Sequence, residues 1–550
     1  MTEAAFLIGA FALLSQLLGL FRDRALAHFL GPSSSLDIYY AAFRVPDVIF
    51  NSFSTLVSIT VLIPFFIDRL EANGEKTAQN GASDLMNQIF TVFLLAIGII
   101  ALIVFFFMPA LSHLVAPGFS PIQRESLIGL SRLMLLSPIL LGLSNLFSTV
   151  TQMYKRFTVY ALAPVCYNLG IILGIFFFLP YWGIYGLGFG VALGALCHML
   201  LQLPVLRSHG FWPRFTFEIN FTGIKRIFLL SLPRTLALGL SSITLTIIIA
   251  IATTLNEGAV SIFNFSFNLQ AVPITIIGLS YSVAVFPTLS LAYAQGSLVE
   301  FKNQIISVAR QIIFWSLPVM VLFIVLRAHI VRVILGSGEF TWSDTRLTAA
   351  ALALFALSVL AQSLIGLIVR GYYAAGKTRR PLVVNLIFTA LEVFLAFLFL
   401  YLFRHFPVFK YFIEGLLRVS DVPGTEILML PLGYSIGTIL NYYALWILFK
   451  KDFMHNGEAL PFRATLFQSF CAAVIIGAVT YVFLGVFDNV FSIDKFWGLL
   501  AQALFSGVLG IVCGILVLKL LKSPELTTIT KALRHKIWKT ETIVSEGPEM

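Results

Sequence analysis

Long apolar runs separated by short polar segments dominate the chain. A helix needs about 20 apolar residues to cross a hydrocarbon layer about 30 Å thick. Fourteen runs approach or exceed this length, near 5–30, 36–66, 85–110, 126–150, 158–179, 183–206, 222–253, 258–290, 305–326, 346–370, 381–403, 427–449, 464–487 and 496–518. Turn-forming pairs such as Gly31-Pro32 and Pro117-Gly118 separate them. The pattern predicts an all-α polytopic membrane protein with about fourteen transmembrane helices and no soluble catalytic domain.

Composition and charge agree with a membrane protein whose termini are both cytoplasmic. Hydrophobic residues make up 59% of the 550 residues and charged residues only 11%, and the net charge is +10. With the N-terminus inside, 23 Lys and Arg residues fall in cytoplasmic segments and eight fall in outer segments. This orientation agrees with the excess of Lys and Arg that cytoplasmic loops of membrane proteins carry. The basic residues are scattered over many short loops, so the charge does not indicate nucleic-acid binding.

Two motifs recur after six predicted spans and indicate an internal repeat. Tyr, basic residues and a Pro-x-x-x-Asn element occur at Tyr154 to Asn168 and again at Tyr373 to Asn385. The second motif is Ser58-Ile-Thr-Val-Leu-Ile-Pro64, which corresponds to Tyr281-Ser-Val-Ala-Val-Phe-Pro287. An even number of spans per repeat keeps both copies the same way up in the membrane. A third match at a larger offset places an insertion of roughly two dozen residues near 404–426. The predicted domains are a six-helix N-terminal lobe (1–215), a six-helix C-terminal lobe (216–455), helices 13 and 14 (456–522) and a cytoplasmic tail (523–550).

Three arginines and three aspartates cluster in an apolar region near the N-terminus, at Arg22, Asp23, Arg24, Asp37, Arg44 and Asp47. A charge in the middle of a membrane helix costs about 2.5–3.5 kcal/mol, so such residues normally face a bundle interior or a wet cavity. Pairing of Arg22 with Asp37, or of Arg24 with Asp23, does not neutralise Arg44 as well. A positive charge left over in this way suits a phosphate-bearing substrate, because the guanidinium fork matches phosphate oxygens. Lone polar residues such as Asn168, Asn385 and Ser231 fit hydrogen bonding between helices. The cysteines and histidines show neither metal-ligand nor nucleophile spacing, so no enzyme, metal or cofactor is predicted.

Five sequence motifs are spread along most of the chain. They are Ser15-Gln-Leu-Leu-Gly19-Leu-Phe-Arg22-Asp23, Ala42-Phe43-Arg44-Val-Pro46, Val115-Ala-Pro-Gly-Phe119, Phe286-Pro-Thr-Leu-Ser290 and Arg370-Gly-Tyr-Tyr-Ala-Ala-Gly-Lys-Thr-Arg-Arg-Pro381. Together they resemble motifs of the MurJ/MviN family of lipid II flippases, within the multidrug/oligosaccharidyl-lipid/polysaccharide exporter superfamily. The resemblance implies fourteen helices and transport without covalent catalysis. Its implied substrate is undecaprenyl-pyrophosphate-linked disaccharide-pentapeptide, moved from the inner to the outer leaflet of a bacterial plasma membrane, with a lipid-tail groove at about 464–518.

The family's cavity residues carry over only in part. Arg22, Asp23, Asp37 and Arg44 match, whereas Gln16, Phe50-Asn51 and Asn268 stand where the family usually has arginine. We therefore expect Arg22, Arg24, Arg44 and Arg234 to meet the phosphates. The remaining members of the expected substrate site, Asn51, Asn268 and Gln16, are expected to hydrogen-bond sugar or peptide.

These departures leave two alternatives open: export of another polyprenyl-linked glycan, and a membrane scaffold of the same fold that transports nothing. Both transport hypotheses require Arg22 and Arg44, whereas a scaffold does not. The expected partners are the glycan lipid, the bilayer and cell-wall synthesis proteins. The membrane potential is the expected driving force, because it acts on charge at about 2.3 kcal/mol per 100 mV. Asn385, Thr389 and Glu392 are the candidate residues for a sodium site, but the seventh span carries no acidic residue near Ile249 that would complete it.

Overall fold

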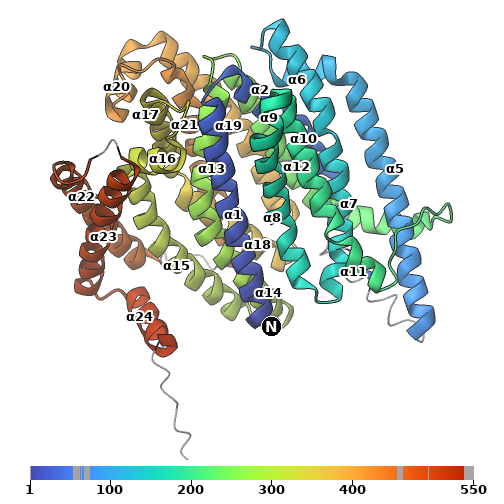
Figure 1. Ribbon diagram of the computed structural model, residues 1–550. Coiled ribbons are helices and arrows are strands. Elements are labelled where there is room, and N and C mark those ends of the chain that lie inside the picture. Colours follow the sequence, from blue (N-terminus) through green and yellow to red (C-terminus); the bar gives the residue numbers. More distant parts are fainter. Residues whose placement is uncertain are drawn as a thin grey trace, which may run out of the picture. The chain divides into compact units, whose positions relative to one another are not determined.

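The computed structural model describes residues 2–53, 62, 65–66, 75–454, 462–492 and 495–537, and all regular elements within these ranges are helices (Figure 1). The first half contains α1 (Thr2–Leu30), α2 (Ser34–Ala42), α3 (Arg44–Phe53), α5 (Glu75–Val115), α6 (Pro121–Met134), α7 (Leu136–Met153), α8 (Phe157–Leu173), η2 (Gly174–Phe178), α9 (Leu179–Trp182), α10 (Ile184–Leu200), α11 (Leu203–Ser208), α12 (Phe221–Ala252) and α13 (Ala259–Pro273). The second half contains η3 (Ile274–Leu279), α14 (Ser280–Ala294), α15 (Leu298–Val325), α16 (Arg327–Leu335), α17 (Trp342–Ala356), α18 (Val359–Ala374), α19 (Arg379–His405), α20 (Pro407–Leu417), η4 (Thr425–Leu428), α21 (Met429–Phe453), α22 (Arg463–Asp488), α23 (Phe496–Leu520) and α24 (Pro524–Ile537).

The all-α membrane architecture predicted from hydropathy is confirmed. Among the described residues, ten helical segments are long and apolar enough to cross a membrane, or eleven if α17 and α18 form one bent span. The number fourteen stays a prediction. Three of the expected spans are not among these ten or eleven. The first, 5–30, corresponds to α1, which has 29 residues but carries the charged residues Arg22-Asp23-Arg24. The span expected at 36–66 lies partly outside the described residues, and that at 222–253 corresponds to α12.

The chain divides into two compact units that each combine distant parts of the sequence. Unit 1 comprises Met1–Val272, Val331–Phe355 and Thr378–Asn441, and unit 2 comprises Pro273–Ile330, Ala356–Lys377 and Tyr442–Met550.

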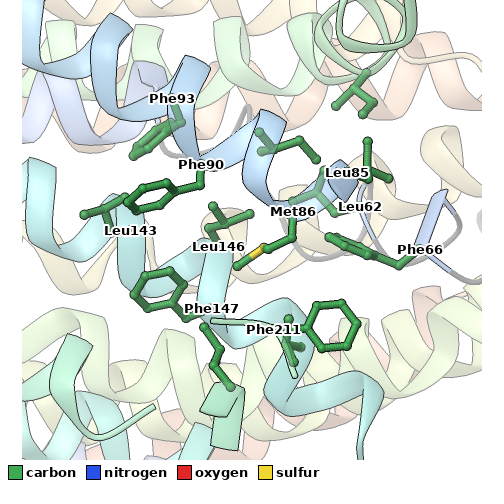
Figure 2. Close-up of a cluster of buried hydrophobic side chains, with 14 of the residues drawn as sticks. Leu62, Phe66, Leu85, Met86, Phe90, Phe93, Leu143, Leu146, Phe147 and Phe211 are labelled. Carbon is green, nitrogen blue, oxygen red and sulfur yellow. The ribbon is translucent and has the colours of Figure 1, made fainter. Parts of the chain in front are cut away.

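A hydrophobic cluster in unit 1 joins α5 and α7 to the segment after α11 (Figure 2). Phe90 of α5 stacks on Phe147 of α7, with ring centroids 6.4 Å apart. Met86, Leu146 and Phe211 are fully or almost fully buried in the same cluster. Such packing fixes helix positions where lipid supplies no hydrophobic driving force between helices.

Glycines allow α8 and η2 to approach α10 closely in unit 1. Gly170 and Gly174 face Gly190 and Gly194, and a Cβ atom added to Gly174 would lie 2.6 Å from the Cα atom of Gly190. Real Cβ atoms do not come this close to backbone atoms, so the position requires glycine. Small residues at such interfaces are the usual means by which membrane helices pack tightly.

In unit 2, α22 and α23 pack side by side and α24 docks beneath them (Figure 1). Gly510 and Gly514 of α23 allow close contact with Thr480 and Ile476 of α22. The buried Glu525 of α24 accepts hydrogen bonds from Thr465 Oγ1 at 2.6 Å and from Ser523 Oγ at 2.9 Å. Its carboxylate thus ties α24 to the start of α22.

The glycine contact leads to a stability prediction. Gly174→Leu forces α8–η2 and α10 apart and should lower the free energy of unfolding by about 1–3 kcal/mol, the usual cost of overpacking. Thermal unfolding of the purified protein in detergent measures the change. Gly98→Leu is the matched control, because a Cβ atom at Gly98 of α5 meets nothing within 4 Å. Equal melting temperatures for the two variants would contradict the prediction.

Candidate functional site

One face of α13 carries a line of polar residues that meets the charged residues near the N-terminus. Ser261, Asn264 and Asn268 are spaced three and four residues apart, so they lie on the same face of the helix. We call these three residues the α13 polar stripe. Asp37 of α2, Arg44 of α3 and Asp23 of α1 each contact one member of the stripe. All six residues belong to unit 1.

Asp37 caps the start of α13. Its Oδ2 atom accepts a hydrogen bond from the backbone N–H of Gly258 at 2.8 Å. Its Oδ1 atom accepts two from Ser261, from the backbone N–H at 2.8 Å and from Oγ at 2.6 Å. A helix N-terminus has unpaired N–H groups and a positive dipole end, so it favours a carboxylate there. Asp37 is only 4% exposed, and its two oxygens are occupied by α13.

Further hydrogen bonds surround this cap. The backbone N–H of Ser34 donates to Glu257 Oε1 at 2.8 Å, and Ser34 Oγ accepts from Gln123 Nε2. The backbone N–H of Glu339 donates to the carbonyl of His28 at 3.0 Å. Together these bonds attach the end of α1 and the start of α2 to the first turn of α6 and to the segments before α13 and α17.

Arg44 contacts the middle of the stripe. Its Nη2 atom donates to Asn264 Oδ1 at 3.1 Å, and its Nε atom donates to the carbonyl of Tyr40 at 3.2 Å. The amide nitrogen of Asn264 donates to the carbonyl of Val260 at 2.8 Å, which leaves its oxygen directed toward Arg44. The guanidinium is therefore held by neutral oxygens and forms no ion pair in the described part of the chain.

A pocket of about 250 Å³ lies at the far end of the stripe. Its lining residues come from α1, α8 and α13: Ser15, Gln16, Gly19, Leu20, Arg22, Asp23, Asn168, Asn268 and Ala271. Arg22 donates to Asp23 Oδ1 from Nη2 at 2.8 Å and from Nε at 3.0 Å. Asn268 Nδ2 donates to Asp23 Oδ2 at 2.9 Å, so both carboxylate oxygens of Asp23 are engaged.

Asn168 completes the wall of this pocket from α8. Its Oδ1 atom accepts from Arg22 Nη1 at 3.3 Å, and its Nδ2 atom donates to Ser15 Oγ at 3.1 Å. The side chain of Arg22 is 23% exposed, whereas that of its partner Asp23 is 4% exposed. Part of the guanidinium therefore faces the pocket and can reach a ligand oxygen.

The pocket offers hydrogen-bonding groups but little net charge. Arg22 and Asp23 neutralise each other, and Gln16, Asn168 and Asn268 contribute amides. The Gln16 side chain forms no hydrogen bond with any residue that the structure describes. Amides pair with hydroxyl and amide groups, while guanidinium pairs with phosphate or carboxylate. The arrangement can hold a polar head group that carries both kinds of oxygen.

Other expected site residues lie elsewhere. Arg24 Nη1 donates to the carbonyls of Val333 at 2.6 Å and Ile334 at 3.2 Å, so it binds the last turn of α16, where a cation suits the helix C-terminus. Asn51 Nδ2 donates to Ser242 Oγ of α12 at 2.8 Å. The side chain of Arg234 lies outside the described part of the structure.

Sequence reasoning missed Ser261 and Asn264 and assigned Asn168 only to hydrogen bonding between helices. The signal was present as polar residues at Ser261, Asn264 and Asn268 in an otherwise apolar segment. Their three- and four-residue spacing is typical of one helix face in contact with a polar partner.

Comparison with known proteins identifies the family. The model of the lipid II flippase MurJ family matches residues 26–501. The chain belongs to the MurJ lipid II flippase family. A probable lipid II flippase MurJ of Rhizobium meliloti is 27% identical over 483 residues, 86% of this chain and 85% of the relative. One of Buchnera aphidicola is 26% identical over 402 residues, 72% of this chain and 78% of the relative. The family is one of bacterial inner-membrane transporters without catalytic activity.

Solved structures confirm the fold. A lipid II flippase MurJ in an inward closed conformation covers 96% of this chain and 100% of its own, with a TM-score of 0.74 and 20% identity. An inward-facing MATE-family multidrug transporter of the MOP superfamily covers 80% of this chain and 94% of its own, with a TM-score of 0.63 and 16% identity. The helical membrane fold expected from the sequence resemblance is therefore confirmed, whereas its fourteen spans stay a prediction.

The Asp37 cap leads to a second prediction. Asp37→Ala removes three hydrogen bonds to a buried carboxylate and leaves donors of α13 unpaired, which should destabilise the protein by about 1–3 kcal/mol. Differential scanning fluorimetry in detergent measures the loss. Glu257→Ala serves as the control, because this exposed acid accepts a single hydrogen bond nearby. If both variants melt at the wild-type temperature, Asp37 does not stabilise the arrangement.

Proposed function

We propose that the chain flips lipid II, the undecaprenyl-pyrophosphate-linked disaccharide-pentapeptide, from the inner to the outer leaflet by alternating access. Family membership over 26–501 and the pocket around Arg22 together support this substrate. The pocket combines a guanidinium for phosphate with amides for sugar or peptide, as this head group requires. No step of covalent chemistry is involved.

In this proposal the hydrogen bonds between the α13 polar stripe and the charged residues near the N-terminus must break during transport. The stripe joins helices of the predicted N-terminal lobe (1–215) to a helix of the predicted C-terminal lobe (216–455). Asp37, Arg44 and Asp23 hold the two together through Ser261, Asn264 and Asn268. Rocking of one lobe against the other is the usual alternating-access movement of repeat-built transporters.

The pyrophosphate first contacts Arg22. It then contacts Arg44, which lies along the same face of α13. Asn264 and Asn268 lie one turn apart, so the two arginines face neighbouring positions along this helix. Asn268 stands where the family usually supplies arginine, and it binds Asp23 instead. Arg22 and Arg44 therefore carry the phosphate interaction, with Arg234 as a further candidate and with Gln16 and Asn51 near the sugar or peptide.

We further propose that both termini are cytoplasmic, that helices 13 and 14 (456–522) hold the lipid tail and that the tail 523–550 is cytoplasmic. The 23-to-8 distribution of basic residues supports the orientation. The side-by-side packing of α22 and α23 supports the second assignment. The membrane potential supplies the driving force, and cell-wall synthesis proteins are the expected partners.

A related exporter function remains the second candidate. The neutral residues at Gln16, Asn51 and Asn268 in place of the family's arginines favour it, because they lower the positive charge available for a pyrophosphate. Such an exporter would carry another polyprenyl-linked glycan through the same pocket.

Complementation of a bacterium depleted of its own lipid II flippase tests the proposal. The wild-type chain should restore growth, whereas Arg22→Ala should abolish it. Removing one partner of a buried charge pair costs about 2–5 kcal/mol, or at least about 30-fold in transport. Arg44→Ala should also fail. Arg404→Ala should not, because Arg404 forms a partly exposed ion pair with Glu426 outside the proposed site.

The controls separate the alternatives. Variants are compared only at equal membrane abundance, measured by immunoblot. Rescue by Arg22→Ala and Arg44→Ala at the wild-type level would contradict any transport role for the site. Failure of the well-inserted wild type, with accumulation of a different polyprenyl-linked glycan after deletion in its own host, would instead establish the exporter function.

A further inference from the structure

The short helix α20 (Pro407–Leu417) follows a membrane span with almost no connecting chain. The span is α19, which ends at His405, and α20 starts two residues later (orange, top of Figure 1). Because a residue of extended chain covers at most about 3.6 Å, α20 must begin at the height of the membrane surface where α19 ends. It lies within the insertion near 404–426 that the internal repeat predicts.

The outward face of α20 is apolar. Val408, Tyr411, Phe412 and Leu416 are 83%, 69%, 63% and 62% exposed, and their three- and four-residue spacing places them on one side of the helix. The buried side holds Ile413, Leu417 and Glu414. A helix on a water-facing surface shows polar residues on its outer side. This exposed face has the opposite character.

Contacts on both sides of α20 fix which face points outward. Phe409 stacks on Phe399 of α19 with ring centroids 6.2 Å apart. Glu414 Oε1 accepts from Thr425 Oγ1 at 2.6 Å. Both contacts lie within unit 1, so the orientation of α20 on α19 follows from that unit alone.

The end of α20 is tied to α17 through Arg346. Its Nη2 atom donates to the carbonyl of Arg418 at 2.7 Å, and Nη1 donates to Asp421 Oδ2 at 2.6 Å. The hydrogen bond from Arg346 holds the pKa of the Asp421 carboxyl below its ordinary range. A helix tethered at both ends presents the same apolar face throughout, which a freely moving loop would not.

We propose that α20 is an interfacial helix that inserts Val408, Tyr411, Phe412 and Leu416 into the lipid leaflet at which α19 ends. Amphipathic helices of this kind lie in the plane of the interface with their apolar face among the upper acyl chains. Tyr411 fits this depth, because aromatic rings with a polar tip collect at the membrane–water boundary. With cytoplasmic termini the leaflet is the outer one. The proposal does not depend on which lipid the protein transports.

Spin labelling in lipid vesicles tests the insertion. The full chain, with its four native cysteines replaced by alanine, is labelled at Phe412→Cys or Leu416→Cys and reconstituted in phosphatidylglycerol–phosphatidylethanolamine vesicles. Ser420→Cys is the matched control, because Ser420 is exposed just after α20 in the polar segment next to Asp421. Power saturation then compares collisions with oxygen, which concentrates in hydrocarbon, and with a water-soluble nickel chelate.

The oxygen-to-nickel collision ratio at positions 412 and 416 should exceed that at 420 by at least about threefold, because only an inserted face is shielded from water. Similar ratios at all three positions would show that the face lies in water and would overturn the proposal. Low collision rates with both reagents at 412 and 416 would mean that protein covers the face, which also overturns it. Two labelled positions ensure that one misfolded variant does not decide the result.

Discussion

The fold depends on how carboxylates inside a membrane protein obtain their hydrogen bonds. In hydrocarbon no water is available, so each buried polar group must be satisfied by the protein itself. Asp37 meets this requirement with the first N–H groups of α13, and Asp23 does so with Arg22 and Asn268. Each acid therefore positions one end of α13 against α1 and α2. The pocket, the stripe and the spacing of the arginines follow from these attachments.

The same need for hydrogen-bond partners indicates how a bound lipid head group could allow the α13 polar stripe to separate from Asp23, Asp37 and Arg44. The polar groups of the stripe cannot separate in an apolar interior without new partners, because an unpaired buried charge is costly. In the function we propose, a phosphate head group that binds Arg22 and Arg44, with water at the opened face of α13, supplies such partners. Transport then exchanges one set of hydrogen bonds for another. On this proposal, a pocket that is nearly neutral in this structure still suits an anionic lipid.

The sequence predicts the membrane fold well, because hydropathy directly reports the cost of placing residues in hydrocarbon. It also reveals Arg22, Asp23, Asp37 and Arg44, since charges stand out in apolar helices. The partners of these residues were harder to find. Asp23 and Asn268 are 245 residues apart, and a single sequence contains no signal for their pairing. Arg24 shows the limit of prediction from the sequence, because its guanidinium binds backbone carbonyls of α16 and no sequence motif indicates such a partner. The insertion that holds α20 was visible only as a change in the repeat offset.

Locking the stripe closed tests the central claim most directly. Ser34→Cys and Glu257→Cys place thiols on the two segments joined beside the Asp37 cap. A short, cleavable thiol crosslinker is applied to cells, and lipid II that reaches the outer leaflet is measured with an externally added hydrolase. The account predicts that crosslinking stops delivery of lipid II, that reduction restores it and that either single-cysteine variant is unaffected. Undiminished delivery by the fully crosslinked protein would contradict the account.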